Sequence, residues 1–489
     1  MIKLSFMKIA HIASEYYPYV KTGGLADVVA ALAGGLAKRG QEVSVFLPAY
    51  RALREHSDWA QAEKILEYEL PLGEESAYGE IWRGKAGRNL TFYLVHREEY
   101  FDRTFPYGTG RRDYEDNFDR FLFFTKAVIE TIFRLRLKLD IVHAHDWPTA
   151  LLPVLLRWEE QRRGNRMVDR TVFTFHNLAF QGIFPLRLFE RTGLPDALQG
   201  MQGLEFYGQM NWLKGGMLFA DKVTTVSGQY RQETLTPAFG CGLDGVLASR
   251  GKDFIAIRNG IDQDLWNPAT DPHLPASFSV SDLAGKDRCR EALLKEFGWG
   301  KKCDEPVFGM ICRLTEQKGI DLVEAVIDWF TEEEKGRLIL LGSGDEEEMR
   351  KWENIAAAHP RRVAFRASMD ERLAHLIEAG ADFFLMPSRF EPCGLNQMYS
   401  QRYGTIPLVG AVGGLIDTVK PLKADATEGD GWIFPAGEKA LREALDAAAA
   451  LYRQPELCKK VRQRIMGKDF GWSGVLDHYL EIYTDLLKL

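Results

Sequence analysis

Two adjacent glycines beside a lysine are the first residues of the chain whose types and spacing could do chemistry. The segment that starts at Lys21 reads Lys-Thr-Gly-Gly-Leu-Ala-Asp, follows the apolar run 9–13 and opens a helical stretch over 25–38. Glycines let the backbone approach a bound group closely, and the free N–H groups and dipole of a helix start attract anions. The glycine patterns of dinucleotide-binding folds and of P-loops are both absent. The segment predicts either an anion site or an ordinary connection between a strand and a helix.

Two cations stand at the end of a later apolar run. Arg313 directly follows the run 307–312, and Lys318 lies in the loop that continues from it. The planar donor fork of arginine and the compact charge of lysine suit a diphosphate, and together they can neutralise a departing nucleoside diphosphate without a metal ion. The alternative is ordinary surface charge that flanks a loop.

A third segment of this kind carries a carboxylate. It follows the apolar run 383–386 and reads Pro-Ser-Arg-Phe-Glu-Pro-Cys-Gly-Leu-Asn-Gln over 387–397. Glu391 comes just before the expected helix, so it can accept from sugar hydroxyls while the backbone N–H groups of Gly394 and Leu395 donate. A glutamate is equally typical of the region around a helix N-cap. Cys393 has no base beside it in the sequence, and we interpret it as a small packing residue.

Histidines follow two further apolar runs. His143 and His145, just before Asp146, have the His-x-His spacing of metal ligands, which makes a metal-dependent hydrolase the rival interpretation. Their place in mid-chain and the total of ten histidines argue against the metal-hydrolase barrels that this spacing resembles. His176, followed by Asn177, either donates to a sugar hydroxyl or carbonyl or is a satisfied structural histidine.

Composition limits the classes of protein. A chain of 489 residues, 46% hydrophobic and 27% charged, is long enough for two or three domains of a soluble globular protein. A net charge of −7 argues against a nucleic-acid binder. Six scattered cysteines without a C-x-x-C pair, and no apolar run long enough to span a bilayer, predict a cytoplasmic protein without membrane contact. Because the first strand is expected from Lys8, either Met1 or Met7 is the expected start.

Short apolar runs alternate with helical patterns along the chain, which is typical of parallel sheets covered by helices. In the first half the runs are 9–13, 43–47, 90–95, 141–145, 171–175 and 222–226, with a helix expected over 118–135. The alternation restarts with 307–312, 337–341, 363–366, 383–386 and 406–409. We interpret residues 259–306, rich in Asp, Pro, Ser and Gly, as a linker with an irregular insertion. The chain therefore predicts two doubly wound α/β units with a boundary near residue 259.

A weak internal repeat supports two similar units. The sequence Gly-Gly-Leu-Ala-Asp-Val-Val at 23–29 resembles Gly-Gly-Leu-Ile-Asp-Thr-Val at 413–419, and each follows an apolar run. Ligands of open α/β sheets bind outside the carboxyl ends of the strands. We therefore expect the two sheets to face each other across a deep cleft, with anion-attracting helix starts on both walls.

Taken together, these motifs resemble the bacterial glycogen synthases and plant starch synthases. The resemblance runs in order from about Lys8 to the C-terminus, and it is carried by Lys21–Leu25, His143–Trp147, His176–Asn177, Asn259–Asp262, Arg313 with Lys318, and Pro387–Leu395. It implies a GT-B architecture, with two Rossmann-like domains around a cleft. It also implies a hexosyltransferase that moves glucose from ADP-glucose to the non-reducing end of an α-1,4-glucan, glycogen or a maltooligosaccharide, with retention of configuration.

The resemblance also assigns domains and site residues. The implied domains are 1–258 on the acceptor side, 259–470 for the nucleotide sugar, and 471–489 as a helix that packs back on the first domain. Lys21 and Gly24 would contact the donor diphosphate, and Arg313 and Lys318 would hold it from the opposite wall. The residues implied around the glucose are His176, Asn259, Glu391, Cys393 and Gly394. Asp146, Asn177 and Tyr107 would lie near the acceptor or the reacting centre, and the implied catalytic set is Lys21, His176, Arg313, Lys318 and Glu391.

Other functions stay open at the level of the sequence. Tyr399 stands where broader retaining GT-B enzymes carry a second glutamate, a replacement that the glucan synthases share. A transferase with a UDP-sugar donor and a small acceptor is one alternative, because the residues do not reveal the base of the nucleotide. A silent nucleotide-sugar sensor would be expected to lose a charged site residue, and a metal hydrolase is the remaining alternative. For the leading interpretation we expect no metal ion and no cofactor beside the donor ADP-glucose.

Overall fold

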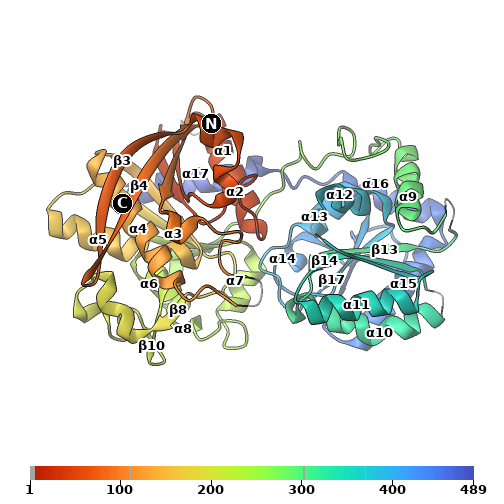
Figure 1. Ribbon diagram of the computed structural model, residues 1–489. Helices are drawn as coiled ribbons and strands as arrows, with labels where there is room; N and C mark the ends of the chain where they lie inside the picture. The colour runs from red at the N-terminus through yellow and green to blue at the C-terminus, as the bar shows by residue number, and fades with distance from the viewer. Residues whose placement is uncertain (1–5, 110–111, 301–302, 334, 369, 489) are drawn as a thin grey trace. The chain divides into compact units, whose positions relative to one another are not determined.

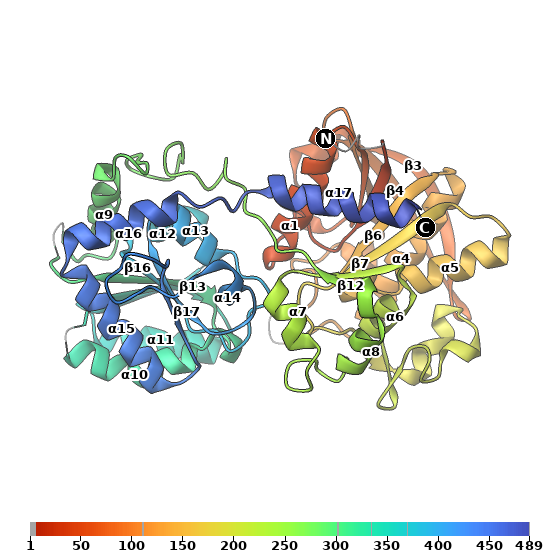
Figure 2. The ribbon, with the colours of Figure 1, turned by 180° about the vertical axis from the view of Figure 1, so that it is seen from behind.

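The chain folds into two α/β units (Figures 1 and 2). The computed structural model describes residues 6–109, 112–300, 303–333, 335–368 and 370–488. Unit 1 comprises Met1–Val226, Arg231–Asn259 and Trp472–Leu489, and unit 2 comprises Ser227–Tyr230 and Gly260–Gly471. The expected start at Met1 lies outside the described residues, as do Gly110 and Arg111 in the loop after Tyr107.

Unit 1 is built on a nine-stranded sheet in the order β12-β11-β7-β6-β1-β2-β5-β4-β3. Its strands are β1 (Lys8–Ile12), β2 (Glu42–Pro48), β3 (Glu63–Leu72), β4 (Glu75–Lys85), β5 (Leu90–His96), β6 (Leu139–His145), β7 (Val168–Thr174), β11 (Lys222–Thr225) and β12 (Phe254–Ala256). All strands from β12 to β5 in this order pair in parallel. Central strands such as β1 and β6 are almost wholly buried, which explains the near-continuous apolar runs that predicted them.

An antiparallel edge of this sheet was not predicted. Strands β3 and β4 form a hairpin that pairs with β5, and β8 (Ile183–Pro185), β10 (Gln209–Asn211) and β9 (Glu205–Phe206) form a separate small sheet. The hairpin turns at Gly73, whose φ of +70° favours glycine. Its strands carry many exposed charged side chains, so they lack the apolar run that marks a strand buried on both faces.

The C-terminal helix belongs to unit 1. The helices of this unit are α1 (Gly24–Lys38), α2 (Arg51–Arg54), α3 (Glu98–Phe101), α4 (Asn117–Arg134), α5 (Leu152–Arg163), α6 (Trp212–Phe219), α8 (Asp244–Ser249) and α17 (Trp472–Lys488); α7 (Gly228–Thr234) begins in unit 2. Helix α17 packs against α1 (Figure 2), and Leu476 lies so close to Gly35 that a Cβ on that glycine would be 2.6 Å from Leu476 Cδ1. Leu476, Leu480 and Tyr483 share one apolar core with β1 and β2.

Unit 2 is built on a six-stranded parallel sheet in the order β15-β14-β13-β16-β17-β18. Its strands are β13 (Val307–Arg313), β14 (Arg337–Ser343), β15 (Val363–Ala367), β16 (Phe383–Met386), β17 (Ile406–Gly410) and β18 (Trp432–Phe434). Its helices are α9 (Ala284–Glu296), α10 (Ile320–Glu332), α11 (Glu346–Ala358), α12 (Glu371–Gly380), α13 (Asn396–Arg402), α14 (Gly413–Thr418), α15 (Glu438–Tyr452) and α16 (Pro455–Met466). The prediction of two Rossmann-like α/β units is confirmed.

The prediction of an irregular linker over 259–306 is wrong in part. From Gly260 on, the segment belongs to unit 2, and it contains helix α9, which packs against α12. The charged sequence of α9 concealed this, because Lys286 is buried and donates hydrogen bonds to Ala379 O (2.9 Å), Tyr403 O (3.0 Å) and Thr405 Oγ1 (2.7 Å). A buried lysine with three oxygen partners is a structural tie between elements that apolar periodicity does not reveal.

No helix in the described part of the chain is both long and apolar enough to cross a bilayer.

Candidate active-site half in unit 1

The predicted residues of unit 1 follow the carboxyl ends of three neighbouring strands. Strands β7, β6 and β1 are adjacent in the sheet, and the loops after them carry His176 with Asn177, Asp146, and Lys21 with Gly24. Carboxyl ends of parallel strands meet at one edge of a sheet, where α/β folds bind their ligands. The topology therefore brings these five residues to one edge of unit 1.

A buried carboxylate that sequence reasoning missed holds the Lys21 loop. Glu15 accepts hydrogen bonds from Thr22 N (2.6 Å), Thr22 Oγ1 (2.7 Å) and Tyr107 Oη (2.7 Å). Burial raises the pKa of Glu15, and these hydrogen bonds, which lower the pKa, offset only part of that effect. Because its hydroxyl is also bonded to Ser14 Oγ (2.7 Å), Tyr107 acts in this structure as a support of the loop. Its predicted contact with the acceptor stays a prediction.

Lys21 stands at the exposed start of helix α1. Its Nζ lies 2.9 Å from the Asp27 carboxylate, and its side chain is 40% exposed. The N-cap residue Gly23 has no side chain that could cap the first N–H groups of this 15-residue helix. A Cβ at Gly23 would meet no atom within 4 Å, and its φ of −164° is open to any residue. Neither backbone nor packing therefore explains glycine at this position.

Asp146 holds the loop that carries His176. Its Oδ1 accepts from His176 N at 2.6 Å, and its own backbone has a φ of +58°, a region that non-glycine residues seldom adopt. Such strain is typical of functional sites. Burial raises the pKa of Asp146 to about 7; the charge of Glu15 adds to this effect, while the amides of His176 and Asn177 oppose it.

The raised pKa of Asp146 predicts a specific pH dependence of stability. Between its ordinary value of 3.8 and about 7, the folded chain binds the Asp146 proton more often than the unfolded chain does. Raising the pH through this window therefore lowers the free energy of unfolding, by up to roughly 4 kcal/mol from this group. Asn cannot titrate, so Asp146→Asn should lose less stability than the wild type between pH 4 and 7.

Urea midpoints measured across this pH range would check the prediction, with the exposed Asp196→Asn in the same unit as the control. Only the difference between variant and wild type is interpreted, because it cancels the other titrating groups. Parallel pH curves for Asp146→Asn and the wild type would contradict the raised pKa.

Four histidines cluster beside this edge; His11, His143 and His145 are buried, and His176 is partly exposed. His11 on β1 is in register with His143 on β6, and His143, His145 and His11 are the one group in the described part of the chain whose ligand atoms, within 4.8 Å of one another, could hold a metal ion. His143 bonds to Tyr483 Oη (2.7 Å) and Thr174 Oγ1 (2.6 Å), and His145 bonds to both His11 (3.1 Å) and His176 (3.2 Å). Hydrogen bonds to protein groups thus occupy every ring nitrogen of these three except His11 Nε2, which leaves a metal ion few lone pairs.

The other predicted residues of unit 1 lie in different surroundings. Asn177 is half-buried, and its Oδ1 caps its own turn by accepting from Ala179 N at 3.0 Å. Asn259 is the last residue before the chain passes to unit 2; it is buried, and its Oδ1 has no hydrogen-bond partner among the described residues. A buried amide oxygen without a partner is uncommon and fits a group that binds a ligand.

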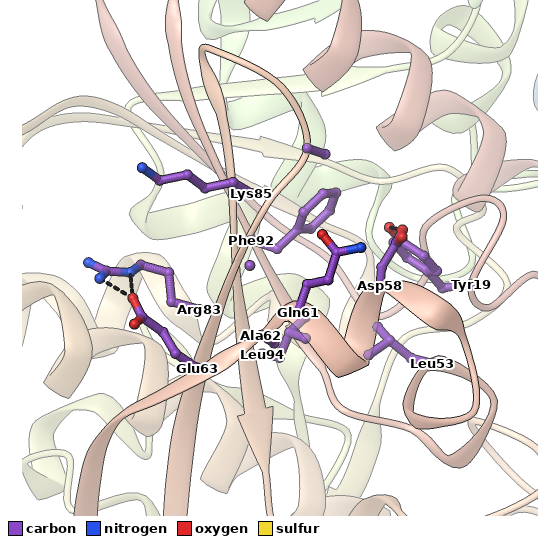
Figure 3. A pocket seen from close by; sticks show the side chains of 12 residues that line it. Tyr19, Leu53, Asp58, Gln61, Ala62, Glu63, Arg83, Lys85, Phe92 and Leu94 are labelled. Carbon is purple, nitrogen blue, oxygen red and sulfur yellow. Dashed lines mark hydrogen bonds and ion pairs between the residues drawn. The ribbon is translucent and has the colours of Figure 1, made fainter.

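A pocket of about 240 Å³ in unit 1 is lined by residues other than those predicted for the site (Figure 3). Strands β3, β4 and β5 and the residues after α2 line it; Arg83 is paired with Glu63 at one end, and Tyr19 bonds to Asp58 at the other (Figure 3). None of the predicted site residues is among its lining residues. The pocket therefore contributes nothing to the predicted site.

Candidate active-site half in unit 2

An ion pair stands at the carboxyl ends of β13 and β16, which are neighbours in the sheet of unit 2. Lys318 Nζ lies 2.6 Å from Glu391 Oε2, which also accepts from Ser388 Oγ at 3.0 Å. The Lys318 side chain is 18% exposed and that of Glu391 7%, so the pair is well shielded from water. Arg313 is exposed, and its side chain makes no hydrogen bond or ion pair with the described residues. Its guanidinium is therefore free to bind an anion.

Close backbone contacts join the two loops that carry this pair. Gly319 has a φ of +68°, and a Cβ there would lie 2.1 Å from Pro387 O, so the position requires glycine. Arg389 N donates to Gln317 O (2.9 Å), which fixes one loop on the other. The arrangement holds Lys318 and Glu391 at one place relative to their strands.

The turn at Cys393 and Gly394 is packed on the glycine pair of the internal repeat. Gly394 has a φ of +70°, and a Cβ at Gly414 would lie 2.2 Å from Cys393 O. Gly414 N donates to Glu391 O at 3.0 Å. Cys393 is buried, which agrees with its interpretation as a small packing residue. The Gly413–Gly414 segment thus supports the Glu391 loop.

Tyr399 has a packing role that its place in the motif did not reveal. Its ring stacks on that of Trp266 at a centroid distance of 3.8 Å, and the ring of His375 also stacks on Trp266 at 3.8 Å. His375 in turn bonds to Asp271 at 2.7 Å. This stack ties the segment after Asn259 to helices α12 and α13.

Comparison with known proteins assigns the chain to a class. Residues 8–249 match the family model of the starch synthase catalytic domain, and residues 294–465 match that of glycosyl transferases group 1. A sucrose-phosphate synthase from Thermosynechococcus elongatus, 18% identical over 99% of both chains with a TM-score of 0.62, shares the fold. Two Rossmann-like units of this kind define a GT-B glycosyltransferase.

Closer relatives narrow the class to a family. A glycogen synthase from Opitutus terrae is 52% identical over 481 residues, which cover 98% of this chain and 100% of the relative. A glycogen synthase from Syntrophotalea carbinolica is 41% identical over 99% of both chains. The catalytic domain of starch synthase IV from Arabidopsis thaliana, solved with ADP and acarbose, is 34% identical over 99% of this chain and all of the other, with a TM-score of 0.91. The chain belongs to the family of glycogen and starch synthases.

Proposed function

We propose that this protein is a glycogen synthase that transfers glucose from ADP-glucose to the non-reducing end of an α-1,4-glucan, with retention of configuration. The identity of 52% to a glycogen synthase over nearly the whole chain is the observation that carries the proposal. The structural relative bound to ADP supports an adenine nucleotide as the donor. All six cysteines are free, which fits a reducing compartment, and a cytoplasmic location is part of the proposal.

In this proposal, side chains of both units act on one donor molecule. Lys21 with the start of α1, and Arg313 with Lys318, stabilise the negative charge that builds up on the departing diphosphate. Fixed cations that are already in place supply this stabilisation without reorganisation, so no metal ion is needed. Glu391, held by Lys318 and Ser388, accepts from the sugar hydroxyls, and His176 donates to the sugar. Asn259, Cys393 and Gly394 complete the contacts around the glucose, while Asp146 and Asn177 lie toward the acceptor.

Retention follows from attack on the same face that the diphosphate leaves. The leaving phosphate takes the proton of the acceptor hydroxyl as the new glycosidic bond forms and the old one breaks. None of the proposed site residues is a clear nucleophile for a covalent intermediate, since Glu391 is engaged by Lys318. Exclusion of water matters at this step because hydrolysis of the donor competes with transfer.

A donor and chelator experiment tests the proposed function. Purified protein is given ADP-glucose or UDP-glucose with glycogen or a maltooligosaccharide, with and without EDTA, while glucan lengthening and nucleotide release are measured. We expect lengthening with ADP-glucose, less with UDP-glucose, and no loss in EDTA. No lengthening with ADP-glucose, or activity that disappears in EDTA, would contradict the proposal and favour the alternative transferase or the metal hydrolase.

Gly23→Ala should weaken donor binding without affecting the fold. A Cβ at this position meets no protein atom, so we expect an unchanged thermal midpoint. If the diphosphate approaches the start of α1, however, the added methyl group stands in its way, and the KM for ADP-glucose should rise by about tenfold or more. Steady-state kinetics with thermal unfolding check this, with Gly34→Ala, also free of contacts but on the helix body, as the control. An unchanged KM would place the diphosphate elsewhere.

A further inference from the structure

Three histidines of unit 1 form a continuous hydrogen-bonded chain, in which His11 and His145 are buried and His176 is partly exposed. His11 Nδ1 lies 3.1 Å from His145 Nε2, and His145 Nδ1 lies 3.2 Å from His176 Nε2. His11 and His145 are fully buried, and burial lowers the pKa of His11 and of His176 to about 3 and that of His145 well below its ordinary value. All three rings are therefore neutral at physiological pH, and each carries a single N–H.

A chain of neutral imidazoles can be polarised in only two ways. His145 has one proton, so it must donate to one neighbour and accept from the other. Either His11 donates to His145 and His145 donates to His176, or both hydrogen bonds run in the opposite direction. The first arrangement leaves the proton of His176 on Nδ1, and the second leaves it on Nε2.

The ring of His11, at the buried end of this hydrogen-bonded chain, distinguishes the two arrangements. His11 Nε2 is buried and has no hydrogen-bond partner among the described residues. In the second arrangement this atom would carry an N–H group, and buried N–H groups without a partner are rarer than buried acceptors without one. In the first arrangement it carries only a lone pair. The geometry therefore favours the arrangement in which every N–H of the chain points outward, from β1 toward the loop after β7.

We propose that His145 and His11 are positioning residues that hold His176 in the tautomer protonated on Nδ1, so that His176 presents an N–H donor to the glucosyl group. Nδ1 of His176 makes no hydrogen bond with any described residue, which leaves it available for that contact. The cluster is supported from its other side, because His143 stacks on His145 at a centroid distance of 4.1 Å and is anchored to Tyr483 of α17. The identification of the glucosyl group as the recipient rests on the proposed function.

The tautomer itself can be measured in the wild-type protein without any assay of activity. Two-dimensional ¹H–¹⁵N spectra of protein labelled with ¹⁵N-histidine distinguish a protonated Nδ1 from a protonated Nε2, and the spectrum of His176→Gln assigns the signals of that ring. We expect His176 to be protonated on Nδ1. Protonation on Nε2 would overturn the proposal whatever the enzyme does.

Two variants of His145 separate positioning from packing. His145→Asn retains an amide that can donate toward His176, whereas His145→Leu has similar bulk and cannot. We expect His145→Leu to lower kcat by about 10- to 100-fold, with a small effect on the KM for ADP-glucose and mixed signals of both tautomers at His176. His145→Asn should recover most of the loss. Equal losses in both variants with an unchanged tautomer would reduce His145 to a packing residue and overturn the proposal.

Two further outcomes keep this inference separate from the proposed function. If the wild type fails to lengthen glucan but His176 is protonated on Nδ1, the proposed function fails and the tautomer assignment stands. If elemental analysis finds one zinc ion per chain that is lost in His145→Leu, the cluster is a metal site and the hydrogen-bonded chain is overturned.

Discussion

Replacing Lys318 by alanine should lower kcat by about 10²- to 10³-fold, the loss usually seen when one fixed charge donor to a transition state is removed. Lys318 is shielded from water and held by Glu391 at 2.6 Å, so its charge acts in a medium that screens it poorly. The diphosphate gains its charge as the glycosidic bond breaks, so the loss should appear in kcat more than in the KM for the donor. Nucleotide release at saturating ADP-glucose and glycogen measures it.

The Lys318 experiment needs two controls because the substitution also leaves Glu391 as a buried carboxylate without its cation. Lys318→Ala combined with Glu391→Gln removes that unpaired charge, so it should recover thermal stability without recovering kcat. Lys423→Ala removes a lysine of the same unit that is exposed and paired with Glu428 at 2.8 Å, and it should behave like the wild type. If Lys318→Ala keeps its turnover number, Lys318 does not belong to the site.

Glu391→Gln is expected to have the second largest effect, a decrease in kcat of about 10²-fold. The substitution preserves the shape of the side chain and its bond from Ser388, but it removes the charge that fixes Lys318. It also weakens acceptance from the sugar hydroxyls, because hydrogen bonds to a charged acceptor are roughly twice as strong as neutral ones. Both losses concern the transition state, and steady-state kinetics should show them in kcat.

Glu428→Gln is the matched control for Glu391, since Glu428 is an exposed partner of a lysine in the same unit. Circular dichroism and thermal unfolding establish that both variants are folded. A kcat for Glu391→Gln within about twofold of the control would mean that the carboxylate only packs the loop.

The sequence predicted that several candidate site residues follow the ends of buried strands, because such strands obey a topological rule. Strands buried on both faces are visible as apolar runs, and residues just after them must lie at the carboxyl edge of a sheet. Asp146, His176 and Glu391 could therefore be assigned to strand ends before the order of strands was known. In the structure Asp146 directly follows β6, His176 lies in the loop after β7, and Glu391 lies in the loop between β16 and α13.

What the sequence did not reveal are the partners of these residues. Glu15 supports the Lys21 loop and His11 continues the His145–His176 chain, yet neither lies in a recognised motif. His11 meets His143 only because β1 and β6 are neighbours in register, which depends on the order of strands in the sheet. The sequence did contain one indication of this contact: His11 lies inside an apolar strand, and a buried polar group needs a hydrogen-bond partner.

The hairpin of β3 and β4 and helix α9 were missed for a different physical reason. The hairpin exposes many charged side chains, whereas α9 buries the charged Lys286. Both arrangements break the pattern of apolar residues by which a strand or a helix is predicted. Charged residues that are satisfied by tertiary contacts look like loop residues in a sequence. Such elements can be found only after the structure shows what satisfies them.

Binding of ADP by isothermal titration calorimetry tests the central claim most directly, because that claim is that Lys21 of unit 1 and Lys318 of unit 2 bind the same diphosphate. The wild type, Lys21→Ala and Lys318→Ala are titrated with ADP at low ionic strength, with Lys423→Ala as the control. The account predicts one ADP per chain and an affinity at least about tenfold weaker in each of the two site variants, equivalent to about 1.4 kcal/mol. Wild-type affinity for ADP in Lys21→Ala would contradict it.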